Sequence, residues 1–425
     1  MKALSDFQII QRGDDGFGTL SLEGALPERW PDGTPLRASA LREDDMLYVI
    51  PSLSCAVEGR EWKAEVRLPE GGLYRVRVEG QSGCVIDACH VGVGDIYVVA
   101  GQSNMAGFGK DAAFDPVTLG VHMYSGDGTW QLAMNSLWEG PGSCPALSFG
   151  RRLKAQLGVP IGIVPAAVGG SFIEEWSPCG SGGKLFRNMC RQLEAVGPFK
   201  GYIWCQGCID AHWGDPPRYL DDFRAMLAAW EKELGPHPML TVQINRWMAT
   251  DIHQWDVGWG TVRDAQRRAA LEIGNVYCVP SIDMSLADGI HNSSEANVVL
   301  GERLANVALK ELYHRPGQTA AAVTGAEYVD ETHFRLRFTP GHNVAAMDNI
   351  PSGMDVEDAG GLIPCIKAVH APDGDGLIVE TERPYALPAR MHYAWRPHPP
   401  AFLLRDAWGM PVLACWGVEI AAPKE

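Results

Sequence analysis

The chain has 425 residues, of which 46% are hydrophobic and 21% charged, and its net charge is -16 at pH 7 with a pI near 5.2. This is the composition of a globular protein too long for one hydrophobic core, so we expect two or three domains. Nucleic acids and anionic membranes are bound by basic surfaces, and the acidic balance therefore argues against both as partners. The sequence alone leaves a homo-oligomer open.

Three further features bear on the compartment. No apolar stretch reaches the roughly 18 residues that cross a bilayer, and the first residues lack the pattern of a signal peptide. The eleven cysteines are odd in number and scattered, which suits reduced thiols better than a disulfide framework. We therefore expect a cytoplasmic protein.

Cys205 and Cys208 have the spacing of a metal or redox pair, but no second Cys or His pair accompanies them, so we predict no metal and no cofactor.

Residues 1–93 alternate short apolar runs with Gly, Pro and Asp turns, which predicts an N-terminal antiparallel β-domain. Its clearest expected strands are Met46–Pro51, Trp62–Leu68 and Gly72–Val78. A β pattern returns over residues 316–425, which form a third domain or pack with the N-terminal one. The expected strands there are Glu327–Val329, His333–Phe338, Gly376–Glu380 and Met391–Trp395.

Between these regions, residues 94–315 alternate strands with helices. Five continuously apolar runs are typical of parallel strands buried on both faces: Ile96–Val99, Ile161–Ala166, Tyr202–Cys205, Leu240–Ile244 and Val276–Pro280. Amphipathic helical patterns are clearest over Tyr219–Leu234, Val262–Ile273 and Glu295–Leu312. The fold class is therefore α/β, with a three-layer α/β/α domain of about five parallel strands flanked by β-rich regions.

The first of these strands leads into the turn Gly101-Gln-Ser-Asn-Met105, which exposes Ser103 at the carboxyl edge of the sheet. Ligands of open α/β sheets bind at this edge, so Ser103 is the candidate nucleophile. Taken alone, the turn is more typical of a helix N-cap than of a nucleophile. Met105 also distinguishes it from the Gly-x-Ser-x-Gly elbow of α/β-hydrolases.

Two further strand ends carry candidate oxyanion donors. The backbone N–H groups of Gly169 or Gly170 can approach a substrate oxygen closely because glycine has no Cβ, and the Ser103 N–H can join them. The side-chain amide of Gln206, after the third strand, is predicted to complete the oxyanion hole.

The segment Asp288-Gly-Ile-His291 supplies the candidate base and acid, because His291 can take the Ser103 proton while Asp288 orients the imidazole. Asp251 and His253 form a competing pair, to which we assign substrate contact instead. Asp283 is an alternative acid.

In this order, these segments resemble the SGNH hydrolases and most closely their sialate O-acetylesterase-like branch. The resemblance covers roughly residues 95–312 and implies a flavodoxin-like catalytic domain. It rests on Gly101–Met105, Gly169–Trp176, Trp204–Ala211, Arg263–Gln266, Asp288–His291 and Gly301–Leu304, with Tyr393–Leu403 similar to the closing β segment. Cys208 stands where the family pattern has Glu, so the acid role falls on Asp288.

The resemblance implies a serine esterase that removes acetyl groups from carbohydrates. Flat apolar rings suit the C–H faces of sugars, and the acidic surface favours acetylated xylan, mannan or their oligosaccharides over sialic acid. We assign substrate contact to Gln102, Asn104, Trp176, Trp213, Trp247 and Trp255. Two rival hypotheses stay open: a lipid-directed esterase or thioesterase, and a non-catalytic carbohydrate-binding protein on an esterase fold.

Overall fold

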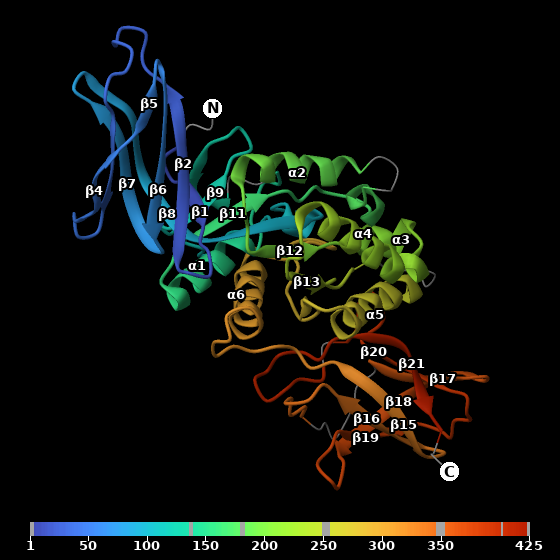
Figure 1. Cartoon of the computed structure of the whole chain (residues 1–425). Coiled ribbons are helices and arrows are strands. Elements are labelled where there is room, and N and C mark those ends of the chain that lie inside the picture. The colour runs from blue at the N-terminus through green and yellow to red at the C-terminus, as the bar shows by residue number, and fades with distance from the viewer. Residues whose placement is uncertain are drawn as a thin grey trace.

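The structure is a computed structural model that describes residues 4–135, 139–178, 183–248, 256–345, 353–400 and 403–422. The predicted residues Asp251, His253 and Trp255 lie outside these ranges. Figure 1 shows three parts in chain order: a β-domain at the N-terminal end, a central α/β domain and a C-terminal β-barrel.

The central domain is built on a mostly parallel sheet with the strand order β10-β9-β11-β8-β12-β13-β14. Its last five strands correspond to the five predicted runs, two of which extend one residue past the strand, and follow the 2-1-3-4-5 order of flavodoxin-like sheets, with β8 as the first strand. The sequence did not predict β9, which is parallel to β11, or β10, which is antiparallel to β9. The strands are β8 (Gly83–Gly101), β9 (Val121–Tyr124), β10 (Trp130–Leu132), β11 (Ile161–Pro165), β12 (Gly201–Cys205), β13 (Met239–Gln243) and β14 (Val276–Pro280).

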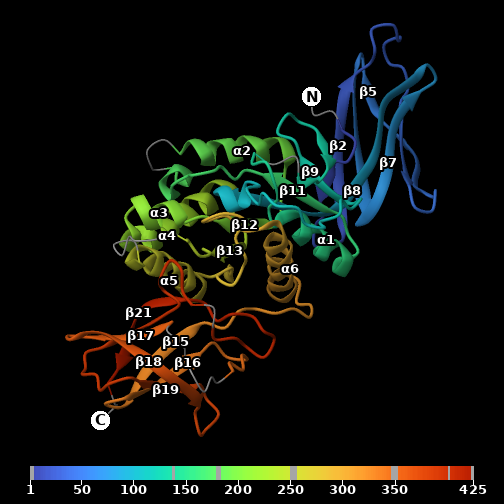
Figure 2. The ribbon, with the colours of Figure 1, turned by 180° about the vertical axis from the view of Figure 1, so that it is seen from behind.

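Helices cover both faces of this sheet, as a three-layer domain requires, and Figure 2 shows the same layers from behind. One apolar core joins the sheet to α2, α4 and α5, and a second joins it to α1 and α6. The helices are α1 (Ala146–Leu157), α2 (Lys184–Val196), α3 (Cys208–Trp213), α4 (Tyr219–Leu234), α5 (Asp256–Glu272) and α6 (Ser294–Glu311). Within the described ranges, none is long and apolar enough to cross a membrane.

The N-terminal β-domain is a sandwich, in which the sheet β2-β6-β5 packs against β3, β4, β7 and the first half of β8. Because β8 continues without a break into the central sheet, the boundary predicted at residue 93 falls inside one strand. The remaining strands are β1 (Ile9–Gln11), β2 (Phe17–Ala25), β3 (Arg37–Arg42), β4 (Tyr48–Ser54), β5 (Ala56–Glu58), β6 (Glu61–Pro69) and β7 (Gly71–Gly80).

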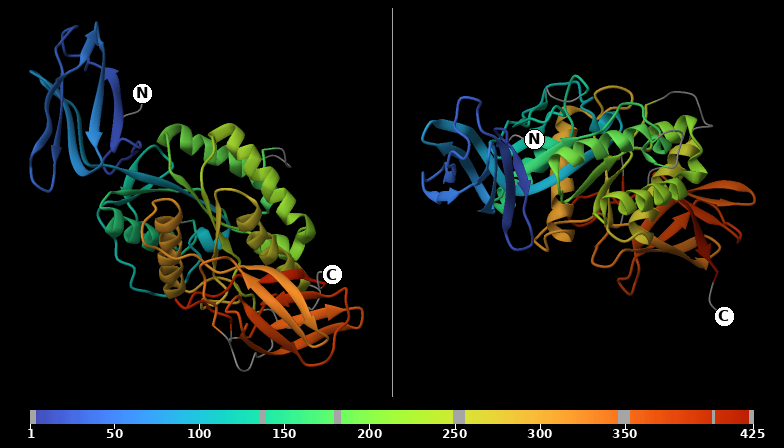
Figure 3. Two further views of the ribbon diagram at one scale, coloured as in Figure 1. Left: turned by 60° about the horizontal axis from the view of Figure 1, so that its bottom comes forward. Right: turned by 45° about the horizontal axis from the view of Figure 1, so that its top comes forward.

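The C-terminal strands close into a barrel of order β15-β16-β19-β18-β17-β20-β21. Figure 3 shows that the barrel and the N-terminal sandwich lie at opposite ends of the central domain. The suggestion that residues 316–425 pack with the N-terminal domain was therefore wrong. The strands are β15 (Val323–Asp330), β16 (His333–Phe338), β17 (Met354–Asp358), β18 (Gly361–His370), β19 (Leu377–Thr381), β20 (Arg390–Tyr393) and β21 (Cys415–Ala421).

A buried arginine joins the barrel region to the central domain. Arg263 on α5 is 0% exposed, and burial lowers the pKa of its guanidinium to about 9. Its nitrogens donate to five main-chain carbonyls, two after β13 and three after β20, at Ile244, Asn245, Ala394, Arg396 and Pro397. The planar fork thereby fixes the loop beyond β13 against the C-terminal segment.

We predict that Arg263→Lys lowers the free energy of unfolding by about 3 kcal/mol, because an ammonium group cannot reach the five carbonyls and leaves several of them buried without a donor. Chemical denaturation measures the change. The matched control is Arg268→Lys on the same helix, whose side chain is 44% exposed and pairs with Glu272. Equal stability of the two variants would contradict the role of Arg263.

Candidate active site

The turn after β8 brings Ser103 to the carboxyl edge of the sheet. Gly101 has φ +116°, and a Cβ there would lie 2.2 Å from the carbonyl oxygen of Cys205 on β12, so only glycine fits. The next residue, Gln102, donates its N–H to that carbonyl at 2.8 Å. Ser103 then opens a short 3₁₀ turn (Ser103–Met105) and is 9% exposed.

The loop before α6 holds His291 through the carboxylate of Asp288. One carboxylate oxygen accepts the N–H groups of Ile290 and His291 at 2.9 and 2.8 Å, and the other lies 2.8 Å from His291 Nδ1 and 3.1 Å from Lys110 Nζ. Burial alone would raise the pKa of Asp288, but these hydrogen bonds outweigh it and hold the pKa well below the ordinary value. An ionised carboxylate therefore orients the imidazole and leaves Nε2 for the pocket.

Asn104 ties this loop to the nucleophile turn. Its side-chain oxygen accepts the Asn292 N–H at 2.8 Å, and its side-chain nitrogen donates to the Ile290 carbonyl at 3.3 Å. The residue next to Ser103 thus holds the backbone on both sides of His291. We predicted substrate contact for Asn104, but it is 4% exposed and engaged in these two bonds, so it is a positioning residue.

Ser103 and His291 line the same pocket, which has a volume of about 350 Å³. It lies beyond the carboxyl ends of β8 and β12, the switch point at which flavodoxin-like sheets bind ligands. The Ser103 hydroxyl makes no hydrogen bond to any described residue, and such catalytic contacts often tighten only when substrate binds.

Two backbone groups of the predicted oxyanion hole face this pocket. Gly169 and Gly170 both line it, and the Gly169 N–H donates to a carboxylate oxygen of Glu139 at 3.3 Å. A donor that accommodates a carboxylate oxygen is directed where an oxyanion would form. The Ser103 N–H donates to no group within the described residues, which leaves it available for the same role.

The prediction for Gln206 was wrong. Its side chain is 0% exposed, and its amide nitrogen donates to the Ser171 carbonyl at 3.0 Å and to the Asp210 carboxylate. The side-chain oxygen accepts the Tyr219 hydroxyl at 3.0 Å. Gln206 therefore belongs to a buried network beneath the pocket. In that network, burial raises the pKa of Asp210 to about 6, against the opposing hydrogen bond from Gln206.

Of the three predicted tryptophan contacts that the structure describes, one lines the pocket and two do not. Trp213, which is 68% exposed, lines the pocket. Trp176 is 0% exposed and packs edge-on against Trp204, so it is a core residue and its assignment to substrate was wrong. Trp247 lies one layer behind the pocket, with its ring 3.6 Å from that of the pocket residue His212.

Two other predicted residues also have structural roles. Gln102 lines the pocket, but its side-chain oxygen accepts the N–H groups of Gly207 and Cys208 at 2.9 and 3.0 Å and so fixes the start of α3. The alternative acid Asp283 instead forms ion pairs with Arg303 and Arg405.

Several pocket residues were not predicted from the sequence. Phe108 stacks on the His291 ring, with centroids 5.2 Å apart and planes at 29°. Glu139 and His212 also line the pocket, and burial lowers the pKa of His212 to about 4. They lie on turns or short helices without periodicity, and no spacing signal connects them to Ser103.

The chain matches one family over most of the central domain. Residues 93–310, about half of the chain, match the family described as carbohydrate esterase, sialic acid-specific acetylesterase. A probable carbohydrate esterase from Arabidopsis thaliana is 29% identical over 247 residues, which cover 50% of this chain and 90% of that protein.

A solved structure extends the similarity in fold to all three parts of the chain. The crystal structure of a novel carbohydrate acetylesterase from Xanthomonas citri superposes with a TM-score of 0.73 at 24% identity, covering 97% of this chain and 98% of that one. The two proteins therefore share the arrangement in which β-rich parts flank an α/β domain.

We predict that Asn104→Ala lowers kcat for p-nitrophenyl acetate by about 100-fold, because the His291 loop loses both of its ties to the nucleophile turn. Steady-state kinetics measure the change. Asn188→Ala on α2 is the control, since that residue lies outside the pocket and should leave kcat unchanged. An Asn104→Ala variant that folds and keeps the full rate would show that the two hydrogen bonds of Asn104 do not position His291.

Proposed function

The chain belongs to the carbohydrate esterases of the sialic acid-specific acetylesterase family, which hydrolyse carboxylic esters, and we propose that it deacetylates neutral sugars through a Ser-His-Asp acyl-enzyme mechanism. The observation that carries the mechanism is the single pocket lined by both Ser103 and His291, with Asp288 bound to the far side of the imidazole.

In this mechanism His291 Nε2 takes the proton of the Ser103 hydroxyl while the serine oxygen attacks the acetyl carbonyl. The N–H groups of Ser103 and Gly169 hold the developing oxyanion, and the ester carbonyl oxygen replaces the Glu139 carboxylate on Gly169. The imidazolium then protonates the departing sugar oxygen, which leaves as a free hydroxyl group. Water, deprotonated by His291, cleaves the acetyl-serine bond and releases acetate.

The walls of the pocket favour a neutral sugar. Among the described residues that line it there is no Lys or Arg, while Glu139 contributes a carboxylate. An acidic sugar would therefore meet a negative charge without a cation to compensate it. The exposed ring of Trp213 offers a flat apolar surface for the C–H face of a xylose or mannose unit.

The size of the pocket favours a short acyl group. Its volume of about 350 Å³ is near the lower end of the range of roughly 300–1,000 Å³ found for small-molecule sites. An acetyl group and the sugar that carries it are suited to this space, whereas the lipid-directed hypothesis requires room for a long acyl chain.

The free cysteine thiols of the chain are consistent with a reducing compartment. The ten cysteines that the structure describes are all free. We therefore propose that the protein acts in the cytoplasm, where imported acetylated oligosaccharides are its substrates, rather than on intact polymer.

We predict that wild type releases acetate from acetylated xylo- and manno-oligosaccharides, as measured by NMR, and that Ser103→Ala reduces the rate by about 10⁶-fold because the nucleophile is lost. Ser52→Ala on β4 in the sandwich is the control for removal of a hydroxyl. Equal acetate release by wild type and Ser103→Ala would refute the nucleophile assignment.

The same assay tests the charge argument. Acetylated sialic acid should react more slowly than the neutral sugars, and Glu139→Gln should narrow this difference because it removes the repelling carboxylate. A faster reaction of acetylated sialic acid in wild type would contradict the proposed preference.

We predict that Asp288→Asn lowers kcat/KM by on the order of 10³–10⁴-fold. The Asn oxygen still accepts the two loop N–H groups, so the loop stays folded, but the neutral amide no longer stabilises the imidazolium. For the same reason the acid limb of the pH profile should move to lower pH. Stopped-assay rates across the pH range measure both effects.

Asp283→Asn is the matched control, because it removes the alternative acid and breaks two ion pairs outside the pocket. It should lower stability more than activity. If Asp283→Asn loses activity and Asp288→Asn keeps it, the acid role belongs to Asp283.

A further inference from the structure

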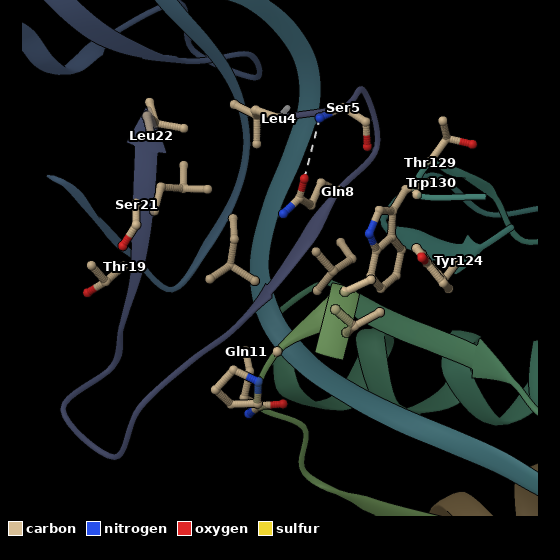
Figure 4. A pocket seen from close by; sticks show the side chains of 18 of the residues that line it. Leu4, Ser5, Gln8, Gln11, Thr19, Ser21, Leu22, Tyr124, Thr129 and Trp130 are labelled. Carbon is tan, nitrogen blue, oxygen red and sulfur yellow. Dashed lines mark hydrogen bonds between the residues drawn. The ribbon is translucent and has the colours of Figure 1, made fainter. Parts of the chain in front are cut away.

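A cavity of about 840 Å³ lies where the N-terminal sandwich meets the central domain. Strand β2 forms one wall, the segment around β1 crosses its middle, and the β9–β10 hairpin forms the other wall. In Figure 4, Leu22 lies on the first wall, Gln8 in the middle, and Tyr124 and Trp130 on the far wall. None of the lining residues belongs to the pocket of Ser103.

Two deeply buried aromatic residues bring unpartnered polar atoms to this cavity. Tyr124 is 3% exposed and Trp130 is 6% exposed, and their rings pack edge-on with centroids 5.7 Å apart. Neither the Tyr124 hydroxyl nor the Trp130 indole N–H has a hydrogen-bond partner within the described residues. Neither atom is among the fully buried polar atoms without a partner, so both keep accessible surface at the cavity that their residues line, where water or a ligand can bind them.

A third polar group lies between the walls. The side-chain oxygen of Gln8 accepts the Ser5 N–H at 3.4 Å, while its amide nitrogen has no partner within the described chain. The cavity thus offers two N–H donors and one hydroxyl that donates and accepts. Ile9, Leu20 and Leu22 supply apolar surface beside them. This mixture is complementary to a molecule with many hydroxyl groups and exposed C–H faces.

The charges at the rim do not favour an ion. Arg67 pairs with Asp15 at 2.5 Å and lies over the Phe17 ring at 3.9 Å, so its charge is already compensated. Asp127 accepts hydrogen bonds from Ser125 and Thr129, which lower its pKa to about 2. Among the described lining residues, no cation is left to bind an anionic ligand, and a neutral ligand is favoured.

We propose that this cavity is an accessory binding site for a neutral oligosaccharide, separate from the catalytic pocket. The choice of sugar rests in part on the proposed function, since the bound chain would be of the same class as the deacetylated substrate. Because β8 runs from the sandwich to the turn of Ser103, a sugar chain held here stays attached to the protein beside the domain that carries the candidate nucleophile. Retention raises the local concentration of further acetyl groups.

The test is calorimetric titration of the full chain with unacetylated xylohexaose and mannohexaose, which bind without turnover. The double variant Tyr124→Phe/Trp130→Phe keeps both aromatic rings and loses the two polar atoms. We expect at least one hexaose to bind wild type and the double variant to bind it about tenfold more weakly. Hydrolysis of p-nitrophenyl acetate should be unchanged in both proteins.

Two control variants place the binding. Tyr202→Phe removes a buried unpartnered hydroxyl from the helix-covered core, and it should leave the affinity at the wild-type value. Trp213→Ala alters the catalytic pocket, and it should also leave this affinity unchanged. Equal affinity of wild type and the double variant, absence of binding to either hexaose, or loss of binding only in Trp213→Ala would each overturn the accessory site.

The outcomes separate this inference from the proposed function. A protein that binds the hexaose through Tyr124 and Trp130 but releases no acetate supports the accessory site and contradicts the proposed function. If wild type releases acetate but binds the hexaose with the same affinity as the double variant, the proposed function is supported and the accessory site is contradicted.

Discussion

Strand β8 is the constraint on which the rest of the structure depends. Over 19 residues it is an outer strand of the N-terminal sandwich and then the first strand of the central sheet, and it ends two residues before Ser103. Close packing fixes its path at two glycines. A Cβ at Gly94 would lie 1.8 Å from the Pro160 carbonyl oxygen, and one at Gly101 would meet that of Cys205. The serine is therefore placed by a strand that cannot shift against either neighbour.

Two side chains, those of Asp288 and Asn104, fix the position of the candidate base His291. Asp288 uses one oxygen to shape its own loop and the other to orient the His291 ring, while Asn104 anchors that loop beside the nucleophile. Each of these groups has its hydrogen bonds before substrate arrives. Little conformational entropy is then lost when an ester binds, which is a condition for efficient proton transfer between Ser103 and His291 in the proposed mechanism.

Periodicity predicted the elements whose burial follows a regular pattern. The continuously apolar strands of the central sheet need no partner to be recognised, and the helix Tyr219–Leu234 was predicted to the residue. The four residues of β9 gave no such signal, because the strand is short and includes His122, which is 0% exposed. The arrangement of the β-rich parts depends on contacts between distant segments, and local patterns do not contain that information.

The sequence predicted which residues gather at the site better than it predicted where their side chains point. The structure brings the predicted Ser103, His291 and Asp288 together, because each was chosen for a chemistry that needs particular atoms at strand ends. Gln206 was misplaced because the chain turns at Gly207, with φ +135°, and directs the amide inward. The same limit applies to Trp176, which points into the core from a 3₁₀ turn. Such directions depend on the backbone of each turn, and residue type does not determine them.

The thiol at position 208, where the family pattern has Glu, changes the electrostatics beneath the pocket. Cys208 is 3% exposed, and burial raises its pKa to about 12 even though the charge of Arg263 opposes the rise. It therefore stays neutral, and within the described residues Arg263 has main-chain carbonyls rather than a carboxylate as its partners. Position 208 itself carries no carboxylate, so Asp288 is the acid that stabilises the imidazolium in the proposed mechanism.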